Sequence, residues 1–503
     1  MSLKNSYYVS SFFWSTLSKV LTAIVGFLSV PLLLGFYGKA EYGILAIATA
    51  CNGYMQLLDL GMNIGTVRFF SQWRAEGKNE LINRVARTNI TFYGLIAIVN
   101  ILGLVGLALW GEGLFSVTHE QFLLLRTCLL IIVLFSVLSW ETTTFNQLLI
   151  ADKHMAFTMQ MQCIITVLKG LLVAMVLLFK LPLTTYFFFL TGVLTLLLIP
   201  YIFRCRKYNL INSIRPATYW NDFKVVITFS LSLFLLSLFQ STATQSRPIL
   251  LSMFASNGAT AVTDFRIIEV VPQMIIMIGG TFSGMFLPKT SEMVARKDEK
   301  AIKEFAYKWT TMTTIVVACL CFPVMLCTNE ILTAYVGASY AHLSVWLLIW
   351  TITVLIQMHT TPGNALVLAY GKTKLLVQVT SVACVCSMIL NVVLCKYFEV
   401  GSAIIAYFLY VCTIIGLYYV VFYKKLLHLS RLKLFLCFIK PTLVGSVLCV
   451  IVNFVPISID IFAGLNERIA FLLICGIKSL IWFLPFVLVL KMLKILDLKS
   501  LKN

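Results

Sequence analysis

The chain has 503 residues, of which 60% are hydrophobic and only 12% are charged, and its mean hydropathy is +0.94. A soluble protein needs more polar surface than this, whereas repeated apolar runs of about 20 residues are typical of membrane spans. The net charge of +19 does not indicate nucleic-acid binding, because basic residues of a polytopic membrane protein set its orientation and contact anionic lipids. Most of the fourteen cysteines lie in apolar runs without histidines at metal-ligand spacing, so no metal site is predicted.

Apolar runs separated by turns and charges predict fourteen transmembrane helices. They lie near 11–35, 42–68, 86–110, 121–150, 157–179, 182–203, 224–253, 259–287, 309–328, 341–369, 374–395, 400–423, 434–455 and 468–491. Lysines and arginines gather in the second, sixth, eighth and twelfth connections and in the C-terminal tail, while the odd-numbered connections are nearly bare. This alternation predicts that the even connections and both termini are cytoplasmic.

The two long charged connections can be aligned with each other. They read "SQWRAEGKNELINRVAR" from Ser71 and "SEMVARKDEKAIKEFAY" from Ser291, an offset of 220 residues. Six helices per repeat give both repeats the same orientation. We therefore predict an all-α polytopic membrane protein with two six-helix lobes related by an axis along the membrane normal, at residues 1–210 and 211–433. Residues 434–503 would add two further transmembrane helices, outside the repeat, and a cytoplasmic tail.

One acidic residue, Asp59, lies in an otherwise uncharged run of the second predicted helix. On a continuous helix its neighbours at steps of three and four form a polar stripe, made of Asn52, Gln56, Asp59, Asn63 and Thr66. Lipid cannot satisfy such a stripe, so it should face protein or a water-filled cavity. Arg68 is out of phase with Asp59 and is predicted to lie at the cytoplasmic interface. Asp59 could line the cavity or be a hydrogen-bonded packing residue.

Other charged residues fall inside predicted helices: Lys19, Lys169, Arg247, Arg266, Glu269 and Lys478, with Glu141 near the cytoplasmic end of its helix. Arg266, Glu269 and Gln273 are spaced to share one helix face. A charge at mid-membrane costs several kcal/mol unless it is solvated or paired. Within the two lobes the basic residues outnumber the acidic ones, which favours a passage for an anionic substrate; Lys19 and Lys169 could instead reach an interface.

Motifs of soluble enzymes are missing from the sequence. There is no GxxxxGK[ST], HExxH or GxSxG, and the connections lack paired carboxylates. We therefore expect a transporter and not an enzyme.

The N-terminal residues carry a family likeness. The stretches "VPLLLGFYGKAEYG" and "LLDLGMNIGTVRF" resemble the opening of the polysaccharide exporters, or O-antigen flippases (Wzx-type), of the MATE-like multidrug/oligosaccharidyl-lipid/polysaccharide superfamily. The likeness is good over roughly the first 90 residues, and the fourteen-helix layout extends it along the chain. Asp59 and Arg68 match the family's second-helix motif.

The resemblance implies a flippase in the bacterial inner membrane. Its substrate would be a polyprenyl-pyrophosphate-linked oligosaccharide, moved by alternating access through a cationic cavity for O-antigen or capsule assembly. Membrane lipids and the polysaccharide polymerase machinery would be its partners. No cofactor is expected, and the coupling ion, Na⁺ or H⁺, stays open. The cavity is predicted to include Lys19, Asn52, Gln56, Asp59, Asn63, Lys169, Arg247, Arg266, Glu269 and Gln273.

Two other transporters remain as alternatives. A multidrug or organic-cation antiporter of the same superfamily would favour an acidic or aromatic cavity. A flippase for the peptidoglycan lipid precursor would also have fourteen helices and a cationic cavity. The second-helix motif favours the polysaccharide branch.

Overall fold

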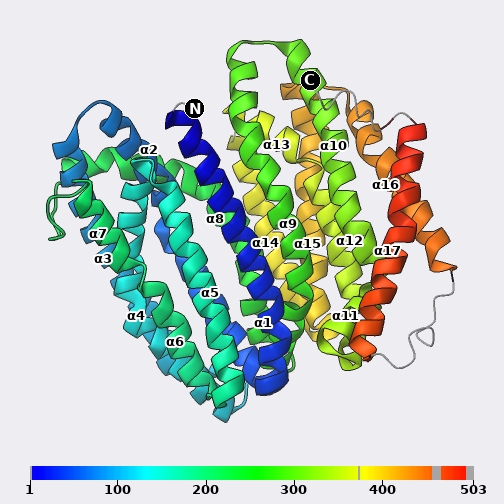
Figure 1. The fold of residues 1–503 in the computed structure, drawn as a ribbon, viewed down its shortest axis with the longest axis horizontal. Helices are drawn as coiled ribbons and strands as arrows, with labels where there is room; N and C mark the ends of the chain where they lie inside the picture. Colours follow the sequence, from blue (N-terminus) through cyan, green and yellow to red (C-terminus); the bar gives the residue numbers. More distant parts are fainter. Residues whose placement is uncertain (1–2, 372–373, 456–465, 494, 496–503) are drawn as a thin grey trace. The chain divides into compact units, whose positions relative to one another are not determined.

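The computed structural model describes residues 3–371, 374–455, 466–493 and 495, and these form helices joined by short turns (Figure 1). Strands are absent from this part of the chain. Eleven helices among the residues searched are long and apolar enough to cross a membrane. The prediction of an all-α polytopic membrane protein is confirmed. The chain divides into two compact units, Met1–Thr263 and Asp264–Asn503. This division does not test the predicted lobe boundaries.

The first unit is built from eight helices and the start of a ninth. They are α1 (Leu3–Met55), α2 (Met62–Ala75), α3 (Asn79–Trp110), α4 (His119–Ala151), α5 (Met155–Phe179), α6 (Leu183–Thr195), α7 (Leu198–Lys207), α8 (Trp220–Phe254) and α9 (Gly258–Ala295). Helix α3 packs along α4, and α1 packs along α5. Helix α8 contacts α1, α2 and α3. A buried core cluster of this unit combines aliphatic and aromatic side chains, the latter including Phe70, Tyr93 and Trp140.

The second predicted helix, 42–68, is not continuous. Its first part belongs to α1, which also contains the predicted helix 11–35 and bends at Gly38, where φ is +78°. Its last part begins α2. Between them, Gln56–Asp59 forms a 3-10 turn (η1), and Leu60 and Gly61 have left-handed φ angles of 52° and 72°. Glycine adopts this conformation without a steric penalty, which places the break at "LG". Asn52 and Asn63 therefore do not share one helix face.

The second unit contains the rest of α9 and the helices that follow it. They are α10 (Glu299–Leu326), α11 (Thr328–Val336), α12 (Ser344–Met358), α13 (Thr361–Ala369), α14 (Lys374–Phe398), α15 (Val400–Leu417), α16 (Arg431–Asn453) and α17 (Glu467–Met492). A 3-10 segment, η3 (Ala338–Leu343), precedes α12, and a π-helical segment, η4 (Tyr418–Leu426), follows α15. The predicted helix 341–369 is interrupted at residues 359–360, between α12 and α13.

The last two helices belong to the core of the second unit. Helix α16 packs along α10, and α17 contacts α11 and α16. The indole of Trp482 donates to the carbonyl oxygen of Gly445 at 3.0 Å and stacks on Phe322 with ring centroids 5.4 Å apart. These helices were predicted to lie outside the repeat, and Trp482 of α17 is fully buried within the second unit.

The turn between α2 and α3 has the same hydrogen bonds as the turn between α9 and α10. In the first, Lys78 N–H donates to Trp73 O and Gly77 N–H to Arg74 O. In the second, Asp298 N–H donates to Met293 O and Lys297 N–H to Val294 O. Each of these residues lies 220 positions after its counterpart, so the structure repeats at the offset predicted from the sequence. The two connections that align in the sequence therefore share their backbone hydrogen bonds.

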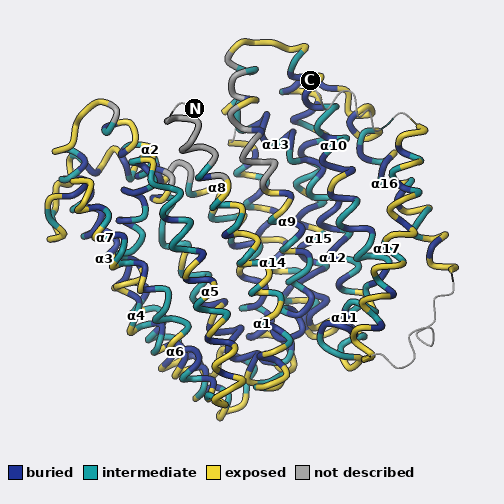
Figure 2. The backbone as a smooth tube through the Cα atoms, in the orientation of Figure 1, coloured by how far each residue is buried: buried dark blue, intermediate teal, exposed yellow. Residues whose placement is uncertain are grey.

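Exposed positions occur on many helices (Figure 2), and a large number of them carry large apolar side chains. Leu102 of α3, Leu134 of α4 and Leu178 of α5 are 66%, 64% and 76% exposed. Large apolar surface of this kind is unfavourable in water and favourable in lipid. The exposed faces therefore support a position within the bilayer.

Candidate functional site

Asp59 lies at the helix break and is held by two donors. The hydroxyl of Tyr93 on α3 donates to Asp59 Oδ1 at 2.6 Å. The backbone N–H of Asn63, in the first turn of α2, donates to Asp59 Oδ2 at 3.2 Å. A helix N-terminus has unpaired N–H groups and a partial positive charge, so it stabilises a carboxylate. The break thus explains how an apolar segment accommodates this acid.

A chain of buried hydrogen bonds leads from Asp59 into the interface between α3 and α4. The Gln147 amide donates to the Tyr93 hydroxyl at 2.8 Å, and Asn89 donates to Gln147 Oε1 at 2.9 Å. Asn89 also donates to the Thr144 hydroxyl at 3.2 Å. Asn89, Tyr93, Thr144 and Gln147 are all almost fully buried. Most of the buried polar atoms of these four side chains are paired with one another, which stabilises the network, and Asn89 Oδ1 lacks a partner among the described residues.

The sequence analysis did not predict this series of hydrogen bonds. A usable signal was present, because Asn89 and Tyr93 are four residues apart on α3 and Thr144 and Gln147 are three apart on α4, so each pair shares a helix face. Polar residues on one face of a membrane helix require a partner helix. The identity of that partner is a tertiary property.

Glu141 also lies against α3. A Cβ atom added at Gly94 would be 3.6 Å from Glu141 Oε1, and the neighbouring Trp140 stacks on Tyr93 with centroids 5.9 Å apart. Glu141 Oε2 is buried and has no hydrogen-bond partner among the described residues. Glu141 was predicted to lie near a cytoplasmic helix end; the structure places it beside the polar chain.

The remaining stripe residues of the first unit differ in their surroundings. Gln56 and Asn63 are exposed, Asn52 is partly buried and Thr66 is fully buried. Arg68 is exposed and its guanidinium lies 4.2 Å from the ring centroid of Phe229 on α8, so it does not pair with Asp59. Whether the predicted residues line a substrate cavity stays a prediction.

Gly61, which precedes α2, and Gly65 within α2 allow α8 to lie close to this site. A Cβ atom at Gly61 would lie 2.9 Å from the carbonyl oxygen of Ser230, and one at Gly65 would overlap the Ser230 hydroxyl. Gly61 and Gly65 are four residues apart, and their lack of side chains lets α8 approach closely.

Lys19 and Lys169 lie on the adjacent helices α1 and α5. One turn away from each, the hydroxyls of Thr22 and Thr166 are hydrogen-bonded at 3.3 Å. Lys19 is exposed and Lys169 is partly buried. Within the part of the chain that the structure describes, neither lysine forms an ion pair. The two helices run parallel, since Thr22 contacts Thr166 and a Cβ atom at Gly170 would contact Val25, so the two lysines lie on opposite sides of the threonine pair along the helix axis.

Arg247, Arg266 and Glu269 have defined hydrogen-bond or ion-pair partners. Arg247 on α8 is buried, and its Nε donates to Thr244 O at 3.1 Å. In the second unit, Arg266 pairs with Glu269 at 2.6 Å, and Gln273 donates to Glu269 at 3.4 Å. These three residues of α9 share a face, as predicted.

Lys478 of α17 pairs with Glu330 of α11 at 2.5 Å. Both side chains are largely buried, with exposed fractions of 13% and 17%. This pair connects the last helix to α11 within the second unit.

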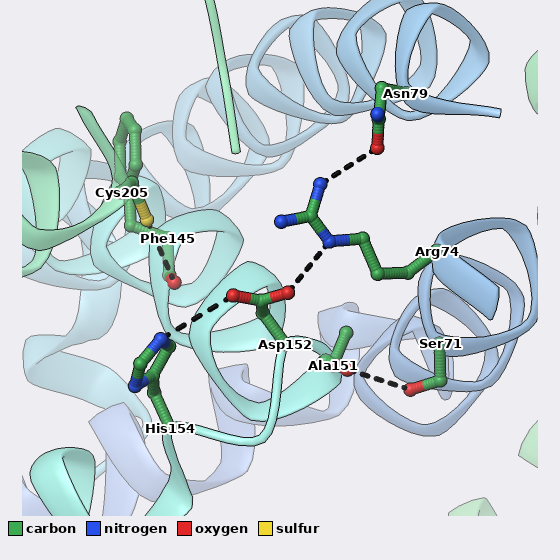
Figure 3. A network of polar contacts seen from close by, with 8 residues as sticks. All are labelled: Ser71, Arg74, Asn79, Phe145, Ala151, Asp152, His154 and Cys205. Atoms are coloured by element: carbon green, nitrogen blue, oxygen red, sulfur yellow. Dashed lines mark hydrogen bonds and ion pairs between the residues drawn. The ribbon is translucent and has the colours of Figure 1, made fainter. Parts of the chain in front are cut away.

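A second polar network joins helix ends of the first unit (Figure 3). Arg74 at the end of α2 pairs with Asp152 at 2.7 Å and donates to Asn79 at 2.7 Å. The other oxygen of Asp152 is 3.4 Å from His154 Nε2. His154 also packs on Tyr208, with centroids 4.2 Å apart. Burial lowers the pKa of His154, against the opposing effect of the Asp152 carboxylate.

The network of Figure 3 holds the turn between α4 and α5 against its neighbours. Ser71 donates to Ala151 O at 3.4 Å, and the Cys205 thiol lies 3.7 Å from Phe145 O. The ends of α2, α4, α5 and α7 are thereby connected. This network is suited to fixing helix ends, and its residues were not predicted as a site.

Known proteins place the chain in a family. The model of the family described as "Polysaccharide biosynthesis protein" matches residues 8–293, which is more than half of the chain. The chain belongs to this family. No curated protein sequence is significantly similar to this polysaccharide biosynthesis protein.

Solved structures of transporters share the fold of this family member. The lipid II flippase MurJ in an inward-closed conformation has 13% identity and a TM-score of 0.69, over 95% of this chain and 99% of MurJ. An inward-facing multidrug resistance MATE transporter of the MOP superfamily has 12% identity and a TM-score of 0.62, over 78% and 92%. A MATE protein in complex with MaD3S has 11% identity and a TM-score of 0.54, over 79% and 93%. These structures show that the chain has the fold of these transporters.

Proposed function

We propose that this polysaccharide biosynthesis protein is a flippase for polyprenyl-pyrophosphate-linked oligosaccharides. It would move repeat units across the bacterial inner membrane for O-antigen or capsule assembly, by alternating access and without catalysing a chemical reaction. Both termini would be cytoplasmic. The family match supports a role in polysaccharide biosynthesis, and the fold shared with MurJ and MATE proteins supports transport.

One observation supports a pyrophosphate as the group that the protein binds. Lys19 and Lys169 lie on adjacent apolar helices and have no acidic partner among the described residues. Two uncompensated charges in a membrane segment are costly unless they are solvated or bind an anion. A pyrophosphate offers several oxygen acceptors to the two ammonium groups. The lysines therefore would hold the phosphates while the lipid tail stays in the bilayer.

The sugars would contact neutral polar groups. Asn52, Gln56 and Asn63 flank the helix break and are at least partly exposed, so their amides can reach sugar hydroxyls. Asp59 would belong to this cavity through its position at the break, although its carboxylate is bonded to Tyr93. Arg247, Arg266, Glu269 and Gln273 remain proposed cavity residues.

The test is made in a strain that lacks the gene. Lipid-linked oligosaccharides are extracted and surface polysaccharide is measured in parallel. We expect the lipid-linked oligosaccharide to accumulate and the surface polymer to be lost. Normal amounts of both in a strain without a second flippase would reject the proposal, and drug sensitivity or cell death on depletion would support an antiporter or a peptidoglycan-precursor flippase.

Variants then test the pyrophosphate site. The double variant Lys19→Ala/Lys169→Ala should fail to restore surface polymer at normal membrane level, and the double Lys→Arg variant should restore it in part because it keeps both charges. Lys180→Ala is the control, since Lys180 is an exposed residue at the end of α5. Full restoration by the double alanine variant would remove both lysines from the site.

A further inference from the structure

Two cysteines of the second unit lie in contact with each other. Cys327 occupies the junction between α10 and α11, and Cys475 lies near the start of α17. Their thiols are hydrogen-bonded to each other, although the two residues belong to helices far apart in the sequence. Both cysteines are free thiols. Two thiols in contact are close enough for a disulfide bond to form after small side-chain movements.

An ion pair one helical turn away holds the same two segments together. Helix α11 packs against α17 (Figure 1). Glu330 is three residues after Cys327, and Lys478 is three residues after Cys475, so each pair shares a helix face. The charged groups of Glu330 and Lys478 are 2.5 Å apart, and both also act electrostatically on the two thiols. Two contacts at the same spacing set the register of α11 against α17 and keep the thiols opposite each other.

The two thiols differ in their access to reagents. Cys327 is completely buried, whereas Cys475 is partly exposed. Next to Cys475, a Cβ atom at Gly476 would meet no atom of the described residues within 4 Å, so the surface beside Cys475 is open. The thiols of Cys205 and Cys449 instead bond to backbone carbonyl oxygens. An external reagent can therefore reach Cys475 first, and Cys327 reacts through its contact with Cys475.

The proposed orientation places this pair toward the outer side of the membrane. The ninth predicted helix, 309–328, ends at an odd-numbered connection, and the fourteenth, 468–491, begins at one. Odd connections lie outside the cytoplasm if both termini are cytoplasmic. The outer compartment of bacteria is oxidising and preserves disulfides, whereas the cytosol keeps thiols reduced.

We propose that Cys327 and Cys475 form a disulfide bond on the outer side of the membrane, with an external disulfide as the oxidant. The Cys475 thiolate attacks one sulfur of that disulfide, breaks its S–S bond and releases one reduced thiol. The Cys327 thiolate then attacks the Cys475 sulfur of the mixed disulfide, which forms the Cys327–Cys475 bond and releases the second reduced thiol. Two cysteine thiols are oxidised, one external disulfide is reduced, and the two protons pass to the released thiols. The outer location rests on the proposed orientation, whereas formation of the bond does not.

This disulfide would fix the last helix to the rest of the second unit. Helix α17 was predicted to lie outside the six-helix repeat, and the Lys478–Glu330 ion pair attaches it to α11 without a covalent bond. A disulfide that closes a long loop of chain removes conformational freedom from the unfolded state. The oxidised protein should therefore be more stable than the reduced protein.

Mass spectrometry of the purified full-length protein tests whether the bond forms. The protein, in detergent, is incubated with oxidised or with reduced glutathione, quenched with acid, unfolded, alkylated with N-ethylmaleimide and digested. We expect a linked Cys327–Cys475 peptide after oxidised glutathione and two alkylated cysteines after reduced glutathione. The melting temperature of the oxidised form should be higher by at least about 3 °C. Alkylated thiols at both positions after oxidised glutathione, or glutathione on Cys475 without a link to Cys327, would overturn the proposal.

Single variants separate this pair from the other cysteines. Cys475→Ser and Cys327→Ser should each abolish the linked peptide and the difference in melting temperature between oxidised and reduced protein. Cys386→Ser removes an exposed thiol of α14 and should keep both. Two single variants cover the case in which serine at the buried Cys327 prevents folding. A difference in melting temperature that persists in Cys475→Ser would assign the effect to other thiols and reject the pair.

The state of the pair in living cells tests the outer location. Aerobically grown cells that make the full-length protein are quenched with acid and alkylated before lysis. A linked peptide from these cells supports the outer location, and fully alkylated Cys327 and Cys475 would reject it. No lipid-linked oligosaccharide enters these assays, so their failure leaves the proposed transport substrate untouched. Normal surface polysaccharide in the deletion strain likewise leaves the thiol pair untouched.

Discussion

Tyr93 donates a 2.6 Å hydrogen bond to Asp59 and accepts one of 2.8 Å from Gln147, so a single hydroxyl connects the helix break to the α3–α4 interface. Tyr93 is completely buried and its ring stacks on Trp140. The ring position is therefore set by packing, and the hydroxyl has little freedom to find other partners. A change at this one atom should affect both the break and the interface.

The first prediction concerns the stability of a variant that lacks the Tyr93 hydroxyl. Tyr93→Phe leaves Asp59 Oδ1 and the Gln147 amide without partners, so we expect the free energy of unfolding to fall by about 1–3 kcal/mol. Thermal unfolding of the purified protein measures this change, and restoration of surface polysaccharide measures its effect on transport. Tyr397→Phe is the matched control, since Tyr397 is 78% exposed. An unchanged melting temperature for Tyr93→Phe would show that the hydrogen bond contributes nothing to stability.

A glycine contact between α1 and α9 gives a second prediction. A Cβ atom at Gly43 would overlap the carbonyl oxygen of Ala259 and lie 2.8 Å from the Thr263 hydroxyl. Backbone must shift to make room, so Gly43→Ala should destabilise the first unit by about 1–3 kcal/mol. Gly26→Ala on the same helix meets nothing within 4 Å and should be neutral or slightly stabilising. Equal melting temperatures for the two variants would contradict the close approach.

The Arg74–Asp152 pair is partly exposed, and its loss should cost less than that of a fully buried pair. Arg74→Ala removes the partner of Asp152 and also the contact with Asn79, so we expect a loss of about 1–2 kcal/mol. Lys78→Ala, which removes an exposed pair with Glu76, should change stability by less than about 0.5 kcal/mol. Chemical or thermal unfolding of both variants tests whether Arg74→Ala is more destabilising than Lys78→Ala.

The pKa of His154 predicts a loss of stability in acid. Burial lowers its pKa in the folded protein below the ordinary value of 6.5, so the unfolded chain binds a proton at a higher pH than the folded protein does. The stability that the neutral, partly buried His154 contributes is fully present above about pH 6.5, the ordinary pKa of histidine. It is lost as the pH falls toward the lower pKa of the folded protein. Melting temperatures measured against pH should therefore decline less in His154→Gln than in wild type. A steeper decline of the melting temperature in His154→Gln would show that the pKa of His154 is raised in the folded protein, not lowered.

Lys478 and Glu330 provide a charge-swap test in the second unit. Lys478→Ala leaves a largely buried carboxylate unpaired and should cost about 3 kcal/mol or more. The double variant Lys478→Glu/Glu330→Lys restores opposite charges and should recover a substantial part of that loss. If the double variant is less stable than either single variant, the two side chains do not act as a pair.

Much of the architecture could be predicted from patterns along the chain. The eighth predicted helix contains Asp264, Arg266 and Glu269, and it forms as α9, in which Arg266 and Glu269 pair on one face. The alignment of Ser71 with Ser291 anticipated two turns with the same hydrogen bonds. Both succeeded because they depend on local spacing. The continuous helix 42–68 was wrong, because left-handed Leu60 and Gly61 interrupt a run whose hydrophobicity gives no sign of the break.

The sequence by itself determined the membrane class, the helical content and the repeat, since length, hydrophobicity and charge spacing act within a span or a turn. Tertiary structure alone decided which polar groups meet. Asp59 and Tyr93 are 34 residues apart, Tyr93 and Gln147 are 54 apart, and Lys478 and Glu330 are 148 apart. No local pattern encodes such pairs, because they arise when packing of apolar faces brings separate helices into register and leaves each buried polar group to find its partner there.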